Sequence, residues 1–300
     1  MSHRDVGTFW EITRPILSAD PVRHTSMLSV GGQLARGARY TDAEPILLTV
    51  HGDSRDSDGR DGDDNETELR GAAICTPPFP LNVSALPSDA APDVVRHLVA
   101  DDVRRRDVSA IRGPNPEVDA FTAAWVAETG DEPQVTMNDR LYRLGELLPP
   151  AGVPGEFRLL PDLADEIFPL IAGWRADFEW EAMDRVVTPD GAAKQILGTI
   201  ASGGWFGLWI ADGRPVAMAA ATGPVEAMSR IGSVYTPPVE RGHGYGAAVT
   251  SAVCRWVLDH GARDVVLHAD LANPVSNAIY QRIGFQAVHD GRIVAFGPHN

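Results

Sequence analysis

The stretch Val234-Tyr-Thr-Pro-Pro-Val-Glu-Arg-Gly-His-Gly-Tyr-Gly-Ala-Ala-Val249 contains the pattern from which the rest of the chain can be interpreted. β-Branched and aromatic residues from Ile231 to Thr236 predict a strand, which Pro237-Pro238 must end because proline has no N–H for the ladder. Glycines alternate at 242, 244 and 246, and the apolar spacing from Ala247 onward predicts a helix to His260. The N–H groups of a first helical turn have no partner within the helix, so such a turn binds anions. The stretch therefore predicts a phosphate cradle, with Arg241 as a fixed charge beside it.

Two other nucleotide-binding motifs fit this stretch less well. A P-loop would carry Lys and then Ser or Thr after the glycines, and these residues do not follow here. Gly242-x-Gly244-x-x-Ala247 satisfies the relaxed dinucleotide fingerprint, and Asp264 lies near the spacing expected for a ribose-binding acid. Asp264 precedes the apolar run Val265 to Leu267, however, whereas the ribose-binding acid should follow a strand. The pattern therefore disfavours a nicotinamide-nucleotide site.

The order of motifs from here to the end of the chain resembles the GNAT superfamily of N-acetyltransferases. The pyrophosphate loop of that family has the form Arg/Gln-x-x-Gly-x-Gly/Ala, which Arg241-Gly-His-Gly-Tyr-Gly246 matches. A helix, a strand at Val265–Ala269, the turn Asn273-Pro-Val-Ser-Asn277, a helix with Tyr280 and the pair Gly284-Phe285 follow in the family's order. Each motif alone is common, whereas the ordered set is specific to the family.

This resemblance implies a fold, a donor and a set of binding residues. It implies the GNAT fold from residue 157 to the end, acetyl-CoA as co-substrate, and no metal. In that family the strand ahead of the loop splays from its neighbour and offers its backbone to the pantetheine arm and the thioester carbonyl. The residues that the resemblance assigns to donor binding are Val234, Tyr235, Thr236, Arg241, Gly242, His243, Gly244, Tyr245, Gly246, Ala247, Asn273 and Asn277.

The catalytic residue implied by the resemblance is Tyr280, the phenol that protonates the leaving sulfur. Considered alone, a tyrosine within a helix is more often a packing residue. Asn273 before Pro274 also fits an ordinary N-cap, and His243 occupies a variable loop position. The sequence does not identify the general base, because surface charge explains each candidate and a water chain could replace it. The candidates are Glu179, Glu181, Asp184 and Glu226.

The composition indicates a globular protein with an acidic surface. Hydrophobic residues make up 44% of the chain, enough for packed cores, and the formal net charge is −15. This charge disfavours nucleic acid and anionic membrane as partners and would favour a cationic acceptor, a small-molecule or peptide amine. Cys75 and Cys254 form neither a disulfide framework nor a zinc pattern, and we see no signal-peptide or membrane-span pattern. We expect a cytoplasmic protein that is a monomer or a homodimer.

Two short matches between the halves of the chain predict an internal duplication. Ala73-Ile-Cys-Thr-Pro-Pro78 resembles Ser233-Val-Tyr-Thr-Pro-Pro238, and Asn115-Pro116 corresponds to Asn273-Pro274 at a similar offset. The segment from Phe79 to Pro87, which follows the first Thr-Pro-Pro, contains no glycine. The first copy is therefore expected to be degenerate and to lack a pyrophosphate loop.

The expected architecture is α/β, of the α+β mixed-sheet kind, with two GNAT-like lobes. Each lobe is a central mixed, mostly antiparallel β-sheet flanked by helices. Residues 1–150 are expected to form the degenerate lobe and residues 151–300 the N-acetyltransferase domain, with the Gly- and Pro-rich segment 145–155 as the linker. The stretch 53–68, dense in Asp, Gly and Arg, fits no EF-hand register and is expected to be a disordered, solvated loop.

Together these patterns predict an acetyl-CoA-dependent N-acetyltransferase that moves the acetyl group directly to an amine within a ternary complex. Two alternatives remain open at this point. One is a non-catalytic acyl-CoA-binding or sensor module, and the other is an acyltransferase that uses a longer acyl-CoA.

Overall fold

The computed structural model describes residues 1–38, 43–52, 68–160 and 165–297, and the chain divides into two compact units. The first unit comprises Met1–Asp139 and His289–Asn300, and the second comprises Arg140–Val288. Two long strands, β6 (Glu132–Leu144) and β12 (Phe285–Gly297), therefore each belong in part to both units. Residues 145–155, the expected linker, contain neither helix nor strand and lie inside the second unit.

The sheet of the first unit is completed by a strand from far along the chain. Its strands, in spatial order, are β1 (Ser2–His3), β2 (Ile46–Gly52), β3 (Glu68–Cys75), β4 (Leu81–Ala85), β5 (Ala110–Pro114), β12 and β6. β4 and β5 run parallel, whereas β2–β3 and β3–β4 are antiparallel. The second part of β12 pairs antiparallel with β5, from Gly291 opposite Pro114 to Ala295 opposite Ala110.

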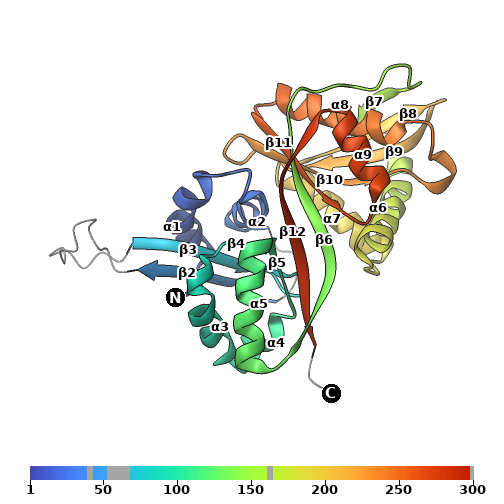
Figure 1. Ribbon diagram of the computed structural model, residues 1–300. Coiled ribbons are helices and arrows are strands. Elements are labelled where there is room, and N and C mark those ends of the chain that lie inside the picture. The colour runs from blue at the N-terminus through green and yellow to red at the C-terminus, as the bar shows by residue number, and fades with distance from the viewer. Residues whose placement is uncertain (39–42, 53–67, 161–164, 298–300) are drawn as a thin grey trace. The chain divides into compact units, whose positions relative to one another are not determined.

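Helices cover both faces of this sheet (Figure 1). One face carries α1 (Val6–Ser18) and α2 (Thr25–Ala35), and the other carries α3 (Ala91–Val99) and α5 (Asn115–Thr129). Side chains alternate between the faces of a strand, so Leu48 of β2 packs into the core under α3 and α5. In that core the Trp125 ring stacks on Phe296 of β12, with ring centroids 4.8 Å apart. The C-terminal strand is thus part of the first unit's hydrophobic core.

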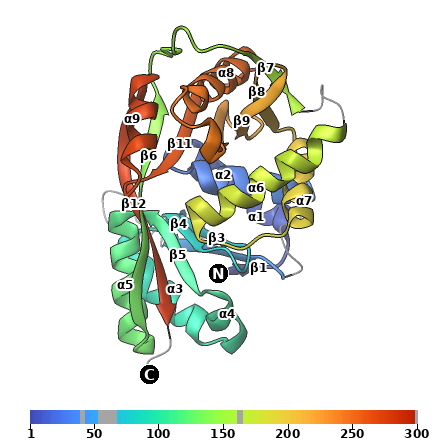
Figure 2. The ribbon, with the colours of Figure 1, turned by 90° about the vertical axis from the view of Figure 1, so that its right-hand side faces the viewer.

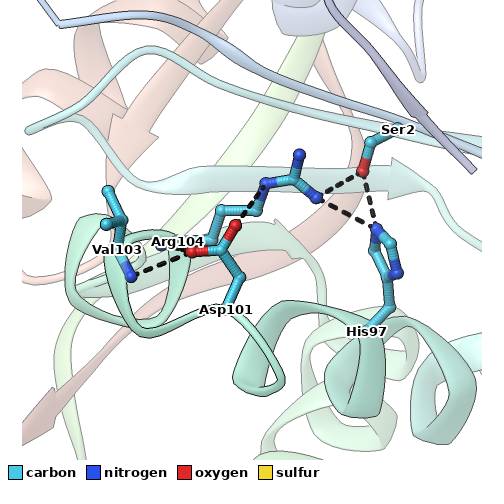
Figure 3. A network of polar contacts seen from close by, with 5 residues as sticks. All are labelled: Ser2, His97, Asp101, Val103 and Arg104. Carbon is cyan, nitrogen blue, oxygen red and sulfur yellow. Dashed lines mark hydrogen bonds and ion pairs between the residues drawn. The ribbon is translucent and has the colours of Figure 1, made fainter.

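A polar network holds the N-terminal strand of the first unit (Figure 3). Ser2 Oγ lies 2.6 Å from His97 Nε2 and accepts a hydrogen bond of 2.6 Å from Arg104 Nη1. Asp101 caps α4 (Asp102–Asp107) by accepting from the Val103 and Arg104 N–H groups, and it also pairs with Arg104 Nε at 3.5 Å. The network joins the first strand to α3 and α4.

The second unit has a mixed sheet whose two faces are also covered by helices (Figures 1 and 2). After β6, its strands in spatial order are β11 (Asp264–Asp270), β10 (Met228–Tyr235), β9 (Arg214–Ala221), β8 (Trp205–Ala211) and β7 (Glu156–Leu159). α8 (Tyr245–Asp259) and α9 (Pro274–Arg282) bury one face. α6 (Phe168–Met183) and α7 (Pro189–Ala201) bury the other.

Local chemistry explains where several of these elements begin and end. Asp212-Gly213 is a residue pair typical of a two-residue hairpin, and both residues have the positive φ that this turn between β8 and β9 uses. Gly130, in the left-handed conformation, ends α5, as the sequence predicts. Cys254 and Cys75 are buried core residues. α2 continues past Gly31-Gly32 to Ala35, and both glycines are buried beside Trp10 of α1.

The predicted correspondence between the two Thr-Pro-Pro segments is wrong, because the two segments follow strands that are not equivalent in their sheets. Thr76-Pro-Pro follows β3, whereas Thr236-Pro-Pro follows β10. The strand of the first unit that pairs in parallel with its neighbour, as β10 does, is β4, which was not predicted. The Asn-Pro correspondence, in contrast, is confirmed, since it begins the helix after the second parallel strand in both units. Both units therefore contain a GNAT-like arrangement of strands and helices.

Two expectations fall on residues that the structure does not describe. These are the acidic stretch 53–68, apart from Glu68 at the start of β3, and Asp162 as a helix cap. Nowhere in the ranges that are described does a helix have both the length and the apolar composition needed to cross a membrane.

We expect the first unit to lose stability in mild acid because of His24. This imidazole lies 3.3 Å from Ser84 Oγ, and burial, opposed in part by Asp20, lowers its pKa from 6.5 to about 4. Folding therefore favours the neutral form, so the His24 contribution is complete above pH 6.5 and decreases as the pH falls to about 4. Thermal unfolding of His24→Gln should show a smaller drop between pH 7 and pH 5 than wild type. An equal drop in both proteins would contradict this.

Candidate functional site

The two parallel strands of the second unit separate toward their carboxyl ends. β10 and β11 are in register from Met228–Asp264 to Ile231–Leu267, and among the described residues their pairing stops there. β10 nevertheless continues to Tyr235, which pairs with Met218 of β9. The register on that side shifts between Gly232 and Tyr235, where Ser233 has a strained φ of 49°. Within the described residues, the end of β10 from Gly232 to Tyr235 therefore has no backbone pairing with β11.

The glycine loop follows this end of β10 and leads into α8. Gly242 and Gly244 have φ values of 86° and 83°, which side chains with a Cβ rarely adopt. Gly244 is the N-cap of the 15-residue helix, and within the described residues no side chain caps it. Since the first helical bond runs from Ala248 N–H to the Gly244 carbonyl, the N–H groups before Ala248 are left for an external acceptor. The predicted anion cradle thus has the expected backbone geometry.

Gly246 lets the end of β10 approach the start of α8. A Cβ at this position would lie 3.3 Å from the hydroxyl of Thr236, closer than ordinary van der Waals contact. The Thr236 carbonyl in turn accepts a 2.9 Å hydrogen bond from Arg241 Nε. The strand end, the arginine and the helix start therefore form one compact structure.

The guanidinium of Arg241 makes contacts on the α6 side of β10. Its Nη2 donates to Glu181 Oε2 at 2.5 Å, and its Cζ lies 5.9 Å from the ring centre of Tyr235. The Tyr235 hydroxyl donates to Glu181 Oε1 at 3.1 Å. Burial, followed by the Glu181 charge, raises the pKa of Tyr235 to about 12, so this phenol remains a donor at neutral pH.

Tyr280 is placed as a protonated phenol within the second unit's core. It belongs to α9, has only 9% of its surface exposed, and packs edge-on against Phe285 with centroids 6.1 Å apart. Burial raises the pKa of its phenol well above the ordinary value, with a smaller contribution from Cys254. Such a group holds its proton throughout the neutral range and can donate it to a stronger base.

The two asparagines of the predicted turn organise the segment between β11 and α9. Asn273 caps α9 by accepting from the Ser276 N–H at 3.0 Å. Asn277 Nδ2 donates to the carbonyls of Asp270 and Asn273, at 2.7 and 2.8 Å. Asn277 Oδ1 accepts from the Tyr142 hydroxyl at 2.7 Å. Both side chains therefore fix the position of the helix that carries Tyr280.

Tyr142 was not identified from the sequence. It is fully buried on β6, a strand that was not predicted, and its hydroxyl also accepts a 3.4 Å bond from Gln281. Apolar and polar residues alternate only from Val135 to Asn138, which is a weak local signal for this strand.

The four candidate bases occupy different environments. Glu179 is buried at 2% exposure and forms ion pairs with Arg175 and Arg185. Asp184 ends α6 in the left-handed conformation. Glu226 precedes β10 and so lies at the end of that strand opposite the glycine loop. Of the four, Glu181 is the one that contacts the loop.

Two other polar residues can be placed relative to the loop. His243 is exposed, stacks on Tyr245 with centroids 5.4 Å apart, and places Nδ1 3.2 Å from the Glu240 carbonyl. Asp264 pairs in register with Met228 and forms an ion pair with Arg143 at 2.6 Å, at the far end of β10 from the loop. This position does not suit a ribose-binding acid, so the nicotinamide interpretation has no structural support.

Comparisons with known proteins agree with this geometry. Residues 170–285 match the family model described as acetyltransferase (GNAT) family. A solved Drosophila protein is 12% identical with a TM-score of 0.64, covering 100% of this chain and 99% of that one. A GNAT-family acetyltransferase from Colwellia psychrerythraea is 11% identical with a TM-score of 0.57, covering 99% and 98%. A tandem GNAT protein from the clavulanic acid pathway is 17% identical with a TM-score of 0.54, covering 91% and 89%.

Among curated proteins, none matches the sequence. At these identities the solved structures establish the fold, and the family model establishes the identity of the segment that contains the glycine loop. Residues 170–285, which lie within the second unit, therefore form a GNAT domain, and the solved structures share the fold of nearly the whole chain.

Proposed function

We propose that this chain is an N-acetyltransferase that takes an acetyl group from acetyl-CoA and transfers it directly to an amine. The observation that supports this best is the combination of two features at one place. The last residues of β10, after Ile231, have no pairing with β11 among the described residues, and the uncapped α8 N-terminus with its two positive-φ glycines follows directly. The first feature suits an extended amide-containing arm and the second suits a diphosphate, which are the two parts of the donor.

The residues present fit a bound thioester, which would supply an activated acyl carbon. Backbone N–H groups near Val234 and Tyr235 would hold the carbonyl oxygen as the amine nitrogen bonds to the acyl carbon. The carbon–sulfur bond then breaks, and the Tyr280 phenol gives its proton to the departing sulfur. The proton lost by the amine passes to water or to a carboxylate, and no metal takes part.

The first unit is proposed to be a degenerate lobe without a donor site. After β4 the chain passes through Leu86 and Pro87 into the 3-10 turn Ser88–Ala90 and then α3, with no glycine at the helix start. The Ala90 and Ala91 amides at this helix start donate to the Pro87 and Ser88 carbonyls. The net charge of −15 favours a cationic amine, from a small molecule or a peptide, as acceptor.

Calorimetric titration of the purified chain with acetyl-CoA tests the proposal, with NAD as the control nucleotide. We expect one acetyl-CoA site per chain and no binding of NAD. Two sites would contradict the proposed role of the first unit, and absence of acetyl-CoA binding would contradict the proposed function. Acetyl-CoA binding without transfer to any amine of a broad panel would favour a sensor module, and tighter binding of a longer acyl-CoA would favour another donor.

Gly244→Ala is expected to weaken acetyl-CoA binding by at least about tenfold. Its φ of 83° is strained for alanine by about 1–2 kcal/mol, and the new Cβ would lie 3.1 Å from Val153. The cradle would therefore relax away from the geometry that presents its N–H groups. Calorimetry measures the change in Kd.

Gly213→Ala is the matched control for this substitution. Its φ of 74° imposes a similar backbone strain at the β8–β9 hairpin, and a Cβ there meets nothing within 4 Å. It should reduce thermal stability while leaving the acetyl-CoA Kd unchanged. Equal losses of affinity in both variants would show that strain anywhere in the unit, and not the cradle, controls binding.

A further inference from the structure

Arg241 stands between the proposed donor site and a carboxylate of the neighbouring helix. It directly precedes the first glycine of the loop, so a diphosphate on the α8 N-terminus would draw its guanidinium. The structure instead shows that guanidinium bound to Glu181 Oε2 at 2.5 Å and to the Thr236 carbonyl at 2.9 Å. The charge that the loop offers to a phosphate is therefore already paired.

Glu181 is itself held in position by the strand that ends at the loop. It lies near the end of α6, a helix that packs against β10, and its second oxygen accepts from the Tyr235 hydroxyl. The Trp174 and Tyr235 rings, with centroids 6.4 Å apart, fix the same helix against the same strand. The side chains of Arg241 and Glu181 are 50% and 39% exposed, so a ligand can reach both.

These contacts predict that Glu181 weakens donor binding. A diphosphate that approaches the loop is repelled by the Glu181 carboxylate and must compete with it for Arg241. A partly exposed ion pair is weak, so a ligand with two phosphates can displace it. Removal of the carboxylate charge should therefore help the donor to bind, although Glu181 lies beside the site.

We propose that Glu181 is a positioning residue that holds Arg241 away from the donor site until the donor's diphosphate displaces it. This inference rests on the proposed function, because it assumes that acetyl-CoA occupies the loop. When Arg241 turns to the diphosphate, the Glu181 carboxylate loses its cation and is left beside the end of β10, bonded to Tyr235. Donor binding thus changes the charge on the α6 side of the strand.

The test is calorimetry of Glu181→Gln with two donors. Acetyl-CoA should bind about two- to five-fold more tightly than to wild type, the range that corresponds to a weak surface ion pair. S-Acetylpantetheine, which has the same arm and thioester but no diphosphate, should bind with unchanged affinity. Weaker or unchanged acetyl-CoA binding, or an equal gain for both donors, would overturn the inference.

Asp177→Asn provides the matched control. Asp177 is exposed one turn earlier on α6, and its charge also acts on Tyr235, but within the part of the chain that the structure describes it forms no hydrogen bond or ion pair with Arg241. Its replacement should leave acetyl-CoA affinity within about twofold of wild type, because it changes only the general electrostatic field around the site. If Asp177→Asn increased acetyl-CoA affinity as much as Glu181→Gln does, the increase would come from the general negative charge of α6, and the proposal would be contradicted.

A double-mutant cycle separates this inference from the proposed function. In an Arg241→Gln background, Glu181→Gln should no longer improve acetyl-CoA binding, because the competition for the guanidinium is gone. Persistence of the gain would overturn the inference while the proposed function stands. Failure of wild type to bind acetyl-CoA would instead overturn the proposed function itself.

Discussion

Replacement of Tyr280 by phenylalanine is expected to lower turnover about 10²-fold while acetyl-CoA affinity stays within a few-fold of wild type. The change removes one oxygen from a phenol that is nearly buried, so the packing against Phe285 is retained. It removes the proton donor for the leaving sulfur, and a positioned general acid contributes about 10²–10⁴ in rate. Steady-state kinetics with saturating donor, together with calorimetric Kd values, measure the two effects separately.

The pH dependence gives an independent check on this role. An acid must be protonated to act, and burial raises the pKa of Tyr280, so the active form persists well above neutrality. Wild-type turnover should therefore show no loss from Tyr280 ionisation up to about pH 10, the ordinary tyrosine pKa. Phe285→Leu, which loosens the same packing without removing a proton, should lower the thermal stability far more than the turnover. Turnover of Tyr280→Phe equal to wild type would remove this residue from the mechanism.

A chain that ends at Val288 is expected to lose the fold of the first unit. Such a chain lacks the part of β12 that pairs with β5, including the buried residues Ile293 and Val294 and the Phe296 ring stacked on Trp125. Burial of each such side chain contributes about 1.5–3 kcal/mol, and a domain's whole stability is about 5–15 kcal/mol. Limited proteolysis should cut the region 1–139 rapidly, and hydrogen exchange should show its amides unprotected.

A chain that ends at Gly297 is the control for this truncation. It keeps all of β12, so its proteolysis pattern and exchange protection should match the full chain. If the chain that ends at Val288 also kept a protected first unit, the C-terminal strand would contribute less to that core than its burial indicates.

The features that sequence predicted well depend on neighbouring residues. The glycine loop, the helix after it and the Asp212-Gly213 hairpin each follow from dihedral and capping preferences within a few positions. The resemblance and the fold class are accordingly confirmed by the family match and the solved structures. Roles of individual donor-binding residues, and of Tyr280, stay predictions.

The features that sequence did not reveal depend on distant partners. β4 has only five residues directly after Pro80, and three consecutive polar residues interrupt β6, so both give weak local signals, and their place in a sheet is set by strands far away in the sequence. β12 was predicted only from Ile293 to Phe296, because its remaining residues have no apolar alternation. In the candidate site, the bonds that join Glu181 to Arg241 and Tyr142 to Asn277 connect side chains 60 and 135 positions apart. No local pattern specifies such pairs.

The assignment of residues 289–297 to the first unit also constrains how the protein is made. A ribosome releases the N-terminal residues first, yet the strand that lies against β5 is synthesised after the whole second unit. Until β12 has been synthesised, the edge of β5 is therefore unpaired, and its hydrogen-bonding groups can bind other strands or chaperones. The two units consequently mature together, since the first cannot be finished until the second has been translated.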